Sequence, residues 1–167
     1  MAVLPITVLG EAVLRQRAKR VPQVDGSIRR LVEDMIDTMR DIGGVGLAAP
    51  QVGIPLRVVV IGIPEEEVIV LINPEIVKRS GERRVVEGCL SVPGYWAEVT
   101  RSVSVTAKGR DLQGRQVRIK AKDDLLAQAL EHEIDHINGF LYIDHLESLD
   151  ELRKTEPKPE EEGAAEL

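Results

Sequence analysis

The hydrophobic pattern predicts a helix over residues 25–41. Apolar side chains recur there at helical spacing, at Ile28, Leu31, Val32, Met35, Ile36 and Met39. Asp25 stands where an N-cap residue is expected, and Gly43 and Gly44 interrupt the pattern at the other end. We expect a surface helix with its apolar stripe facing the core, followed by a shaped loop over residues 46–53.

Two pairs of segments have the β-branched or alternating composition of strands. Residues 57–63 and 68–72 are separated by a proline and a run of glutamates, and they predict one hairpin that Asn73-Pro74 would end. Residues 103–107 and 117–121 flank a glycine-containing turn and predict a second, antiparallel hairpin.

A second helix is predicted from Asp123 to Asn138, where Gly139 provides a C-terminal cap, and a short strand is predicted over residues 140–146. Hairpins followed by one long helix favour an α+β fold in which antiparallel β-sheets pack around a central helix. The predicted domain spans residues 1–152. Residues 153–167 are rich in glutamate and lack apolar periodicity, so we expect an acidic, disordered C-terminal tail.

Composition narrows the class of protein. A chain of 167 residues fits one domain, and its net charge of −6 argues against direct binding of nucleic acid. One cysteine cannot form an internal disulfide, and the first residues lack the pattern of a secretion signal. No apolar run approaches the roughly 20 residues of a membrane span. We expect a cytosolic protein without membrane contact.

The stretch His132-Glu133-Ile134-Asp135-His136 carries the most specific chemical signal. On a helix, histidines four residues apart share one face, and bonds of about 2 Å allow both to bind one metal ion. The single cysteine, Cys89, is the obvious third ligand, and three protein ligands are typical of a catalytic site with one open position. The metal would acidify bound water, and Glu133 could accept its proton and pass it to a leaving amine.

Simpler interpretations exist for each signal. The five-residue motif also occurs by chance on charged helices, and an isolated cysteine is more often an inert core residue. The glycines near residue 44 could only terminate a helix.

Taken together, three motifs resemble those of the peptide deformylases, in the same order and with matching spacing. They are Gly44-Val45-Gly46-Leu47-Ala48-Ala49-Pro50-Gln51, Glu87-Gly88-Cys89-Leu90-Ser91 and His132-Glu133-Ile134-Asp135-His136. The resemblance implies hydrolysis of the N-formyl group from the formylmethionine that begins new bacterial polypeptides, with release of formate. It also implies that Cys89, His132 and His136 hold the metal, with Fe2+ as the native ion and Zn2+, Ni2+ or Co2+ as substitutes.

Further roles follow from the resemblance by position. Gln51, through its side-chain amide, and Leu90, through its backbone N–H, would stabilise the oxyanion formed at the formyl carbon. Gly46 would let the substrate backbone approach as an added strand. Val45 and Ile134 either line the methionine pocket or simply pack in the core.

The surroundings of these motifs suggest supporting contacts. Glu87 and Arg101 are a candidate ion pair that would fix the Cys89 loop, although surface positions would be simpler. His145 is expected at the surface or in packing. Glu131 stands where many deformylases have glutamine, and Trp96 where several have arginine.

The expected partners are nascent polypeptides that bear N-formylmethionine, met at the ribosome or away from it, and we expect a monomer. Two rival functions remain open at this point. A metallopeptidase would need a third ligand downstream of the HExxH motif and would leave the Cys89 motif unexplained. A binding protein with the same fold would hold peptide N-termini without hydrolysing them.

Overall fold

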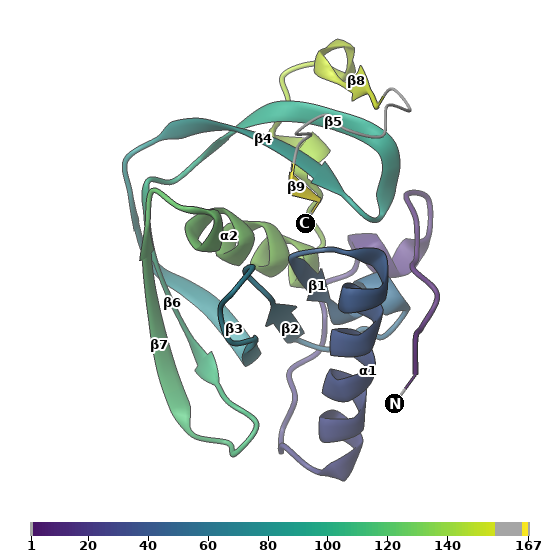
Figure 1. Ribbon diagram of the computed structural model, residues 1–167, viewed down its shortest axis with the longest axis vertical. Helices are drawn as coiled ribbons and strands as arrows, with labels where there is room; N and C mark the ends of the chain where they lie inside the picture. Colours follow the sequence, from purple (N-terminus) through teal and green to yellow (C-terminus); the bar gives the residue numbers. More distant parts are fainter. Residues whose placement is uncertain (1, 156–164, 167) are drawn as a thin grey trace.

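The computed structural model describes residues 2–155 and 165–166, which form two helices and two sheets with short 3-10 turns (Figure 1). The helices are α1 (Gly26–Ile42) and α2 (Leu125–Ile137), and the 3-10 turns are η1 (Ala12–Arg15), η2 (Ala49–Val52), η3 (Tyr142–His145) and η4 (Leu149–Glu151). The strands are β1 (Gly46–Ala48), β2 (Val58–Ile61), β3 (Ile69–Ser80), β4 (Arg83–Cys89), β5 (Val92–Arg101), β6 (Ser104–Arg110), β7 (Gln116–Lys122), β8 (Arg153–Lys154) and β9 (Ala165–Glu166).

The strands form a five-stranded sheet in the order β1-β2-β3-β6-β7 and a four-stranded sheet in the order β8-β5-β4-β9. Neighbouring strands are antiparallel except for the β4–β9 pair, which is parallel. Helix α2 packs on the first sheet and faces the second across its other side (Figure 1). The predicted α+β fold around a central helix is confirmed.

The larger sheet is covered on both faces where β2 runs through it. Val59 and Ile61 belong to the core that includes the α2 residues Leu130 and Ile134. Val58 lies in the other core, against α1. Because successive strand residues point to opposite faces, a strand buried on both faces reads as a continuous apolar run, as residues 58–61 do.

Both predicted helices are confirmed, together with their caps. The Asp25 carboxylate accepts a hydrogen bond from the Ile28 N–H at 3.1 Å, and Asp124 accepts one from Ala127 at 2.8 Å. Each cap satisfies an amide that the first helical turn leaves without a partner. Gly43 ends α1 in the left-handed region, with φ of 76°.

Three local predictions are wrong. Residues 46–53 are not a plain loop, since they contain edge strand β1 and the turn η2. Residues 140–146 are not a strand, because the Asp144 carboxylate accepts from the Leu141 N–H at 2.9 Å and closes the 3-10 turn η3. Asn73-Pro74 does not end β3, which continues to Ser80 with a register shift.

The predicted tail lies partly outside the described residues, which exclude 156–164 and 167. Arg153–Lys154 pair with β5, and Ala165–Glu166 pair with β4, so these four residues differ from the predicted disorder. The domain boundary at residue 152 therefore stays a prediction. None of the helices in the described part of the chain is long and apolar enough to cross a membrane.

Candidate metal centre

Three potential metal ligands meet between α2 and the end of β4. Helix α2 presents His132 and His136 one turn apart, and their Nε2 atoms are 3.2 Å from each other. Cys89 is the last residue of β4, and its Sγ lies 3.3 Å from His136 Nε2. One ligand atom from each residue lies within 4.8 Å of the others, and all three side chains are buried. The structure thus brings together the three predicted ligands.

The chemistry of this cluster fits a divalent transition metal. Thiolate and imidazole are ligands that suit zinc and iron. His132 Nδ1 lies 2.6 Å from Glu87 Oε1, which leaves Nε2 directed at the cluster. A carboxylate on the second ring nitrogen is the usual way in which a protein orients a metal-binding histidine.

Glu87 is held in place by its own partners. Arg101 donates to both carboxylate oxygens of Glu87, at 2.8 and 2.6 Å, and Gln128 Nε2 donates at 3.3 Å. Burial would raise the pKa of Glu87, but the Arg101 hydrogen bonds and the charge of His132 hold that pKa well below its usual value. The predicted Glu87–Arg101 pair is confirmed, and it is buried rather than on the surface.

Arg101 also joins this pair to α2. Its Nη1 donates to Asp135 Oδ2 at 2.7 Å, and His145 Nε2 lies 2.8 Å from the same oxygen. His145 is partly exposed, as expected. The chain of contacts therefore runs from the surface through Asp135, Arg101 and Glu87 to His132.

Glu133 has the opposite environment. It is fully buried, and neither carboxylate oxygen has a hydrogen-bond partner among the described residues. Burial raises the pKa of Glu133 to about 7, against the opposing charge of His132. A buried carboxylate without a donor costs free energy, and a pKa near 7 suits a group that both accepts and releases a proton.

Gly46 makes room for this carboxylate. A Cβ added at Gly46 would overlap Glu133 Oε2 and lie 3.0 Å from Glu133 Cδ. Gly46 is the first residue of β1, an edge strand of the larger sheet. The absence of a side chain is thus needed by the protein's own carboxylate, in addition to any role toward a ligand.

Gln51 faces the cluster from η2. Its Oε1 accepts from the Ala48 N–H at 2.9 Å, which fixes the amide so that Nε2 points to Cys89 Sγ at 3.7 Å and Ser91 Oγ at 3.2 Å. Leu90, the other predicted oxyanion donor, follows Cys89 in the turn between β4 and β5. Both predicted donors therefore come from segments that border the cluster.

Val45 and Ile134 lie close to the site but also in the core. Ile134 is 4% exposed, and Val45 is partly buried against the same apolar cluster. Their role in a methionine pocket stays a prediction.

Three neighbours of the site were not predicted from the sequence. Gln128 lies one turn before His132 on the same helical face, so the helical period could have indicated it. Ser91 is fully buried beside Gln51, and the Tyr142 ring stacks on His132 with centroids 6.3 Å apart. These two contacts arise only from the tertiary fold.

Glu131 shows that a buried acid on α2 can also be fully satisfied. It accepts hydrogen bonds from the Ser102 N–H at 2.6 Å and the Ser102 hydroxyl at 3.1 Å. Glu131 therefore ties α2 to the chain between β5 and β6, whereas Glu133, two residues later, has no such partner.

Comparison with known proteins agrees with this geometry. The family model described as polypeptide deformylase matches residues 3–152. A peptide deformylase of Dehalococcoides mccartyi is 56% identical over 161 residues, covering 96% of each chain. A crystal structure of a peptide deformylase from Legionella pneumophila superimposes with a TM-score of 0.86 at 47% identity, covering 90% of this chain and 89% of that one. A Synechococcus elongatus peptide deformylase, solved in complex with actinonin, has a TM-score of 0.84 at 42% identity, covering 89% of this chain and 81% of that one.

Proposed function

Because the chain belongs to the polypeptide deformylase family, whose metal-dependent members remove the formyl group from N-terminal methionine, we propose that its Cys-His-His cluster holds the catalytic metal. We further propose that Glu133 moves the proton. The observation that carries both assignments is the convergence of three buried ligand atoms beside a buried carboxylate that none of the described residues supplies with a hydrogen-bond donor.

Cys89, His132 and His136 would hold one divalent ion, and Fe2+ is our choice for the native metal. Zn2+, Ni2+ or Co2+ could replace it, because all of them accept thiolate and imidazole ligands. A metal at this position supplies Lewis-acid activation of water and of the formyl carbonyl.

Glu133 would act as base and then as acid. Its carboxylate accepts a proton from the water whose oxygen forms the new bond to the formyl carbon. It then delivers this proton to the peptide nitrogen as the carbon–nitrogen bond breaks, which yields formate and a free N-terminal amine. The free lone pairs of Glu133 support this role, since no other described group competes for them.

Gln51 and Leu90 would stabilise the negative charge that develops on the formyl oxygen. The Ala48 N–H fixes the Gln51 amide with its Nε2 directed at the cluster, where this donor would exchange its contacts with Ser91 and Cys89 for the oxyanion. The Leu90 N–H would be the second donor.

The substrate would bind along the open edge of β1. An edge strand offers unpaired backbone groups, and Gly46 on this strand lies against Glu133. An extended peptide paired with this edge would place its first residue near Val45 and Ile134, which we assign to the methionine pocket.

We place the protein in the bacterial cytoplasm as a monomer that acts on nascent polypeptides, including those still attached to the ribosome. Its relatives are bacterial proteins.

The decisive experiment is formate release from formyl-Met-Ala-Ser by anaerobically purified, iron-loaded protein. Glu133→Ala and the unformylated peptide serve as controls. Formate from the wild type alone supports the proposal. A metal-replete wild type that releases none would refute it, and cleavage of the unformylated peptide would indicate a peptidase.

A further inference from the structure

The outer face of the β3-β6-β7 region carries a concentration of positive charge. Its six basic side chains, which we call the basic face, are Lys78, Lys108, Arg110, Arg118, Lys120 and Lys122. We propose that this face binds the phosphate backbone of double-helical RNA, independently of base sequence.

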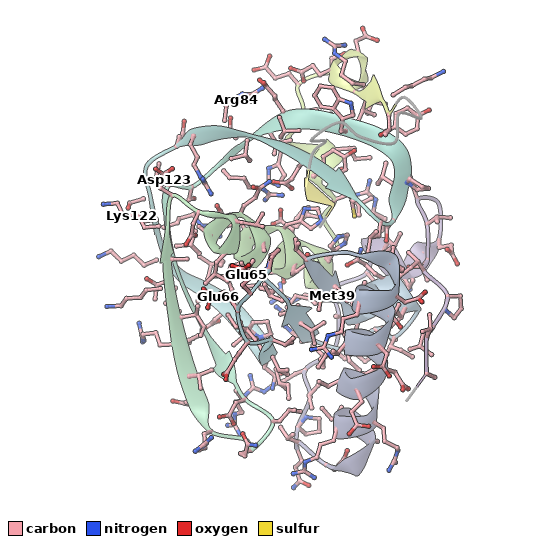
Figure 2. The ribbon with its side chains drawn as sticks, in the orientation of Figure 1. Met39, Glu65, Glu66, Arg84, Lys122 and Asp123 are labelled. Atoms are coloured by element: carbon pink, nitrogen blue, oxygen red, sulfur yellow. The ribbon has the colours of Figure 1, made fainter. Side chains whose placement is uncertain are left out.

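The sheet register places these side chains together on the face turned away from α2. Val105, Ala107 and Ala121 point inward to the α2 core, so the residues that alternate with them point outward. In Figure 2, the side chain of Lys122, at the end of β7, points away from α2. Helix α1 covers β1 and β2 and leaves this part of the sheet open.

Most of this charge is not neutralised by the protein. Glu75 is the acid on this face, and it pairs with Lys108 at 3.0 Å. Within the described part of the chain, no acidic side chain forms an ion pair with Lys78, Arg118 or Lys120. The formal charge of the whole chain is −6, so the positive groups are strongly segregated.

The register also places like charges opposite each other. Lys108 lies directly across from Arg118, and Lys78 and Lys120 flank Thr106 in one row across three strands. Like charges at directly opposed positions destabilise a sheet. Lysines on an edge strand protect against aggregation, which applies to β7, but β3 is an interior strand, so edge protection does not account for Lys78, which lacks an ion-pair partner among the described residues. An anionic ligand would offset the repulsion.

The shape of the face favours a rod-like polyanion. A hollow of about 670 Å³ is lined by Lys78, Arg118 and Lys120, and a second hollow of about 380 Å³ is lined by Lys108, Arg110 and Arg118. Arg118 lines both hollows, so the two adjoin on this face.

The composition of the face selects among polyanions. Both hollows lack aromatic side chains, which protein interfaces and single-stranded nucleic acids use for packing and stacking. Among the described residues that line the hollows, Val77 is the one large exposed apolar side chain, too little to anchor the protein in a membrane. A nucleic-acid double helix presents regularly spaced phosphates and needs neither stacking nor apolar contact. The choice of RNA rests on the proposed function, because a protein that acts on nascent chains at the ribosome meets double-helical RNA there.

This inference revises the expectation drawn from net charge. Net charge describes the whole chain, whereas counterion release from a nucleic acid depends on the charges that meet its phosphates. The basic face lies on the opposite side of the sheet from α2 and the metal centre, so RNA and peptide could be bound together.

The test is binding of the full-length, metal-loaded protein to a fluorescein-labelled RNA hairpin of about 20 base pairs, measured by fluorescence anisotropy. The charge-reversal variant is Lys78→Glu/Arg118→Glu/Lys120→Glu. The matched control, Arg29→Glu/Arg30→Glu/Arg84→Glu, changes the formal charge equally at exposed positions off this face. Both variants should keep the wild-type circular dichroism spectrum and the wild-type rate of formate release.

We expect the wild type and the control to bind, with affinity that falls steeply between about 50 and 200 mM KCl. The basic-face variant should bind at least about tenfold more weakly, and its salt slope should be smaller by about 3. Equal binding by the two variants would overturn the proposal. So would a wild type that prefers phosphatidylglycerol vesicles or polyglutamate over the hairpin, since either result would assign the face to a membrane or an acidic protein.

Discussion

Glu87 and Glu133 are both fully buried beside His132, yet their surroundings are opposite. Glu87, on the β4 side, receives hydrogen bonds from Arg101 and Gln128 and contacts His132 Nδ1. Glu133, on the β1 side, has no donor at all among the described residues. The Glu87 carboxylate is fixed by its hydrogen bonds, whereas the Glu133 carboxylate keeps its lone pairs free of the described residues.

This difference shows that the hydrogen-bond donors around a buried carboxylate indicate its role at the centre. A buried charge with several donors fixes geometry, because any movement would break hydrogen bonds that water cannot replace. A buried charge without donors destabilises the fold, so its retention indicates a function that requires free lone pairs. Substitutions on the two sides should therefore separate activity from stability.

The largest effect is expected for Glu133→Gln. Loss of the proton carrier should lower kcat for formate release by roughly a thousandfold. The free energy of unfolding, measured by urea denaturation, should not fall, because the neutral amide is easier to bury than an unpaired charge.

Glu131→Gln is the matched control on the same helix. Glutamine can still accept from Ser102, so turnover should remain within a few-fold of wild type. If Glu133→Gln loses less than tenfold in kcat, the assignment of Glu133 as proton carrier is wrong.

On the Glu87 side of the centre, Arg101→Met should mainly lower the free energy of unfolding. It leaves Glu87 and Asp135 without their shared cation, and breaking a buried pair in this way costs about 3–5 kcal/mol. Loosening the support of His132 should also weaken metal binding by about tenfold or more, measured by competition with a chelator.

The double variant Glu87→Gln/Arg101→Met tests the coupling. Removing both charges should restore part of the unfolding free energy that Arg101→Met loses. Additive losses in the double variant would mean that the pair does not act as one unit.

Gln51→Ala should have the next largest effect, and it should act on turnover. Removing one oxyanion donor costs on the order of 3 kcal/mol of transition-state stabilisation, so kcat should fall about a hundredfold or more. KM for the formyl peptide should change little, because the interaction strengthens only as charge develops. Steady-state kinetics with a preserved metal content checks this, and a kcat close to wild type would exclude Gln51 as a donor.

The surroundings of each strand explain which strands the sequence could predict. β6 and β7 alternate apolar and polar residues because one face is solvated, and their hairpin was predicted and is confirmed. β4 and β5 were not predicted. They bury Glu87 and Arg101 against each other as an ion pair. These charged residues stand at buried positions where an alternating strand pattern requires apolar residues.

At the centre, local spacing was sufficient to predict that the two histidines and Glu133 lie together. Two histidines and the glutamate share one helix, and Cys89 was named as the chain's one cysteine and by its resemblance to the family motif. The contact between Gly46 and Glu133 could not be predicted, because it joins an edge strand to a helix far along the chain. Asn73 is similar: its side chain bonds the Val21 backbone at 2.8 Å, so β3 continues where local rules predict an end.

Gly46→Ala should give the smallest of these effects and tests the space that Glu133 occupies. The added methyl group would overlap the carboxylate, so Glu133 must shift away from the position that we propose for proton transfer. We expect kcat to fall about tenfold, because small displacements of a catalytic group are costly. Gly26→Ala is the control, since its Cβ would meet only Arg30 Nη1 at 3.5 Å, an ordinary contact. A Gly46→Ala enzyme with wild-type kcat would show that the Glu133 carboxylate does not need this position. The geometry on the Glu133 side of the centre would then be less strictly required than the geometry on the Glu87 side.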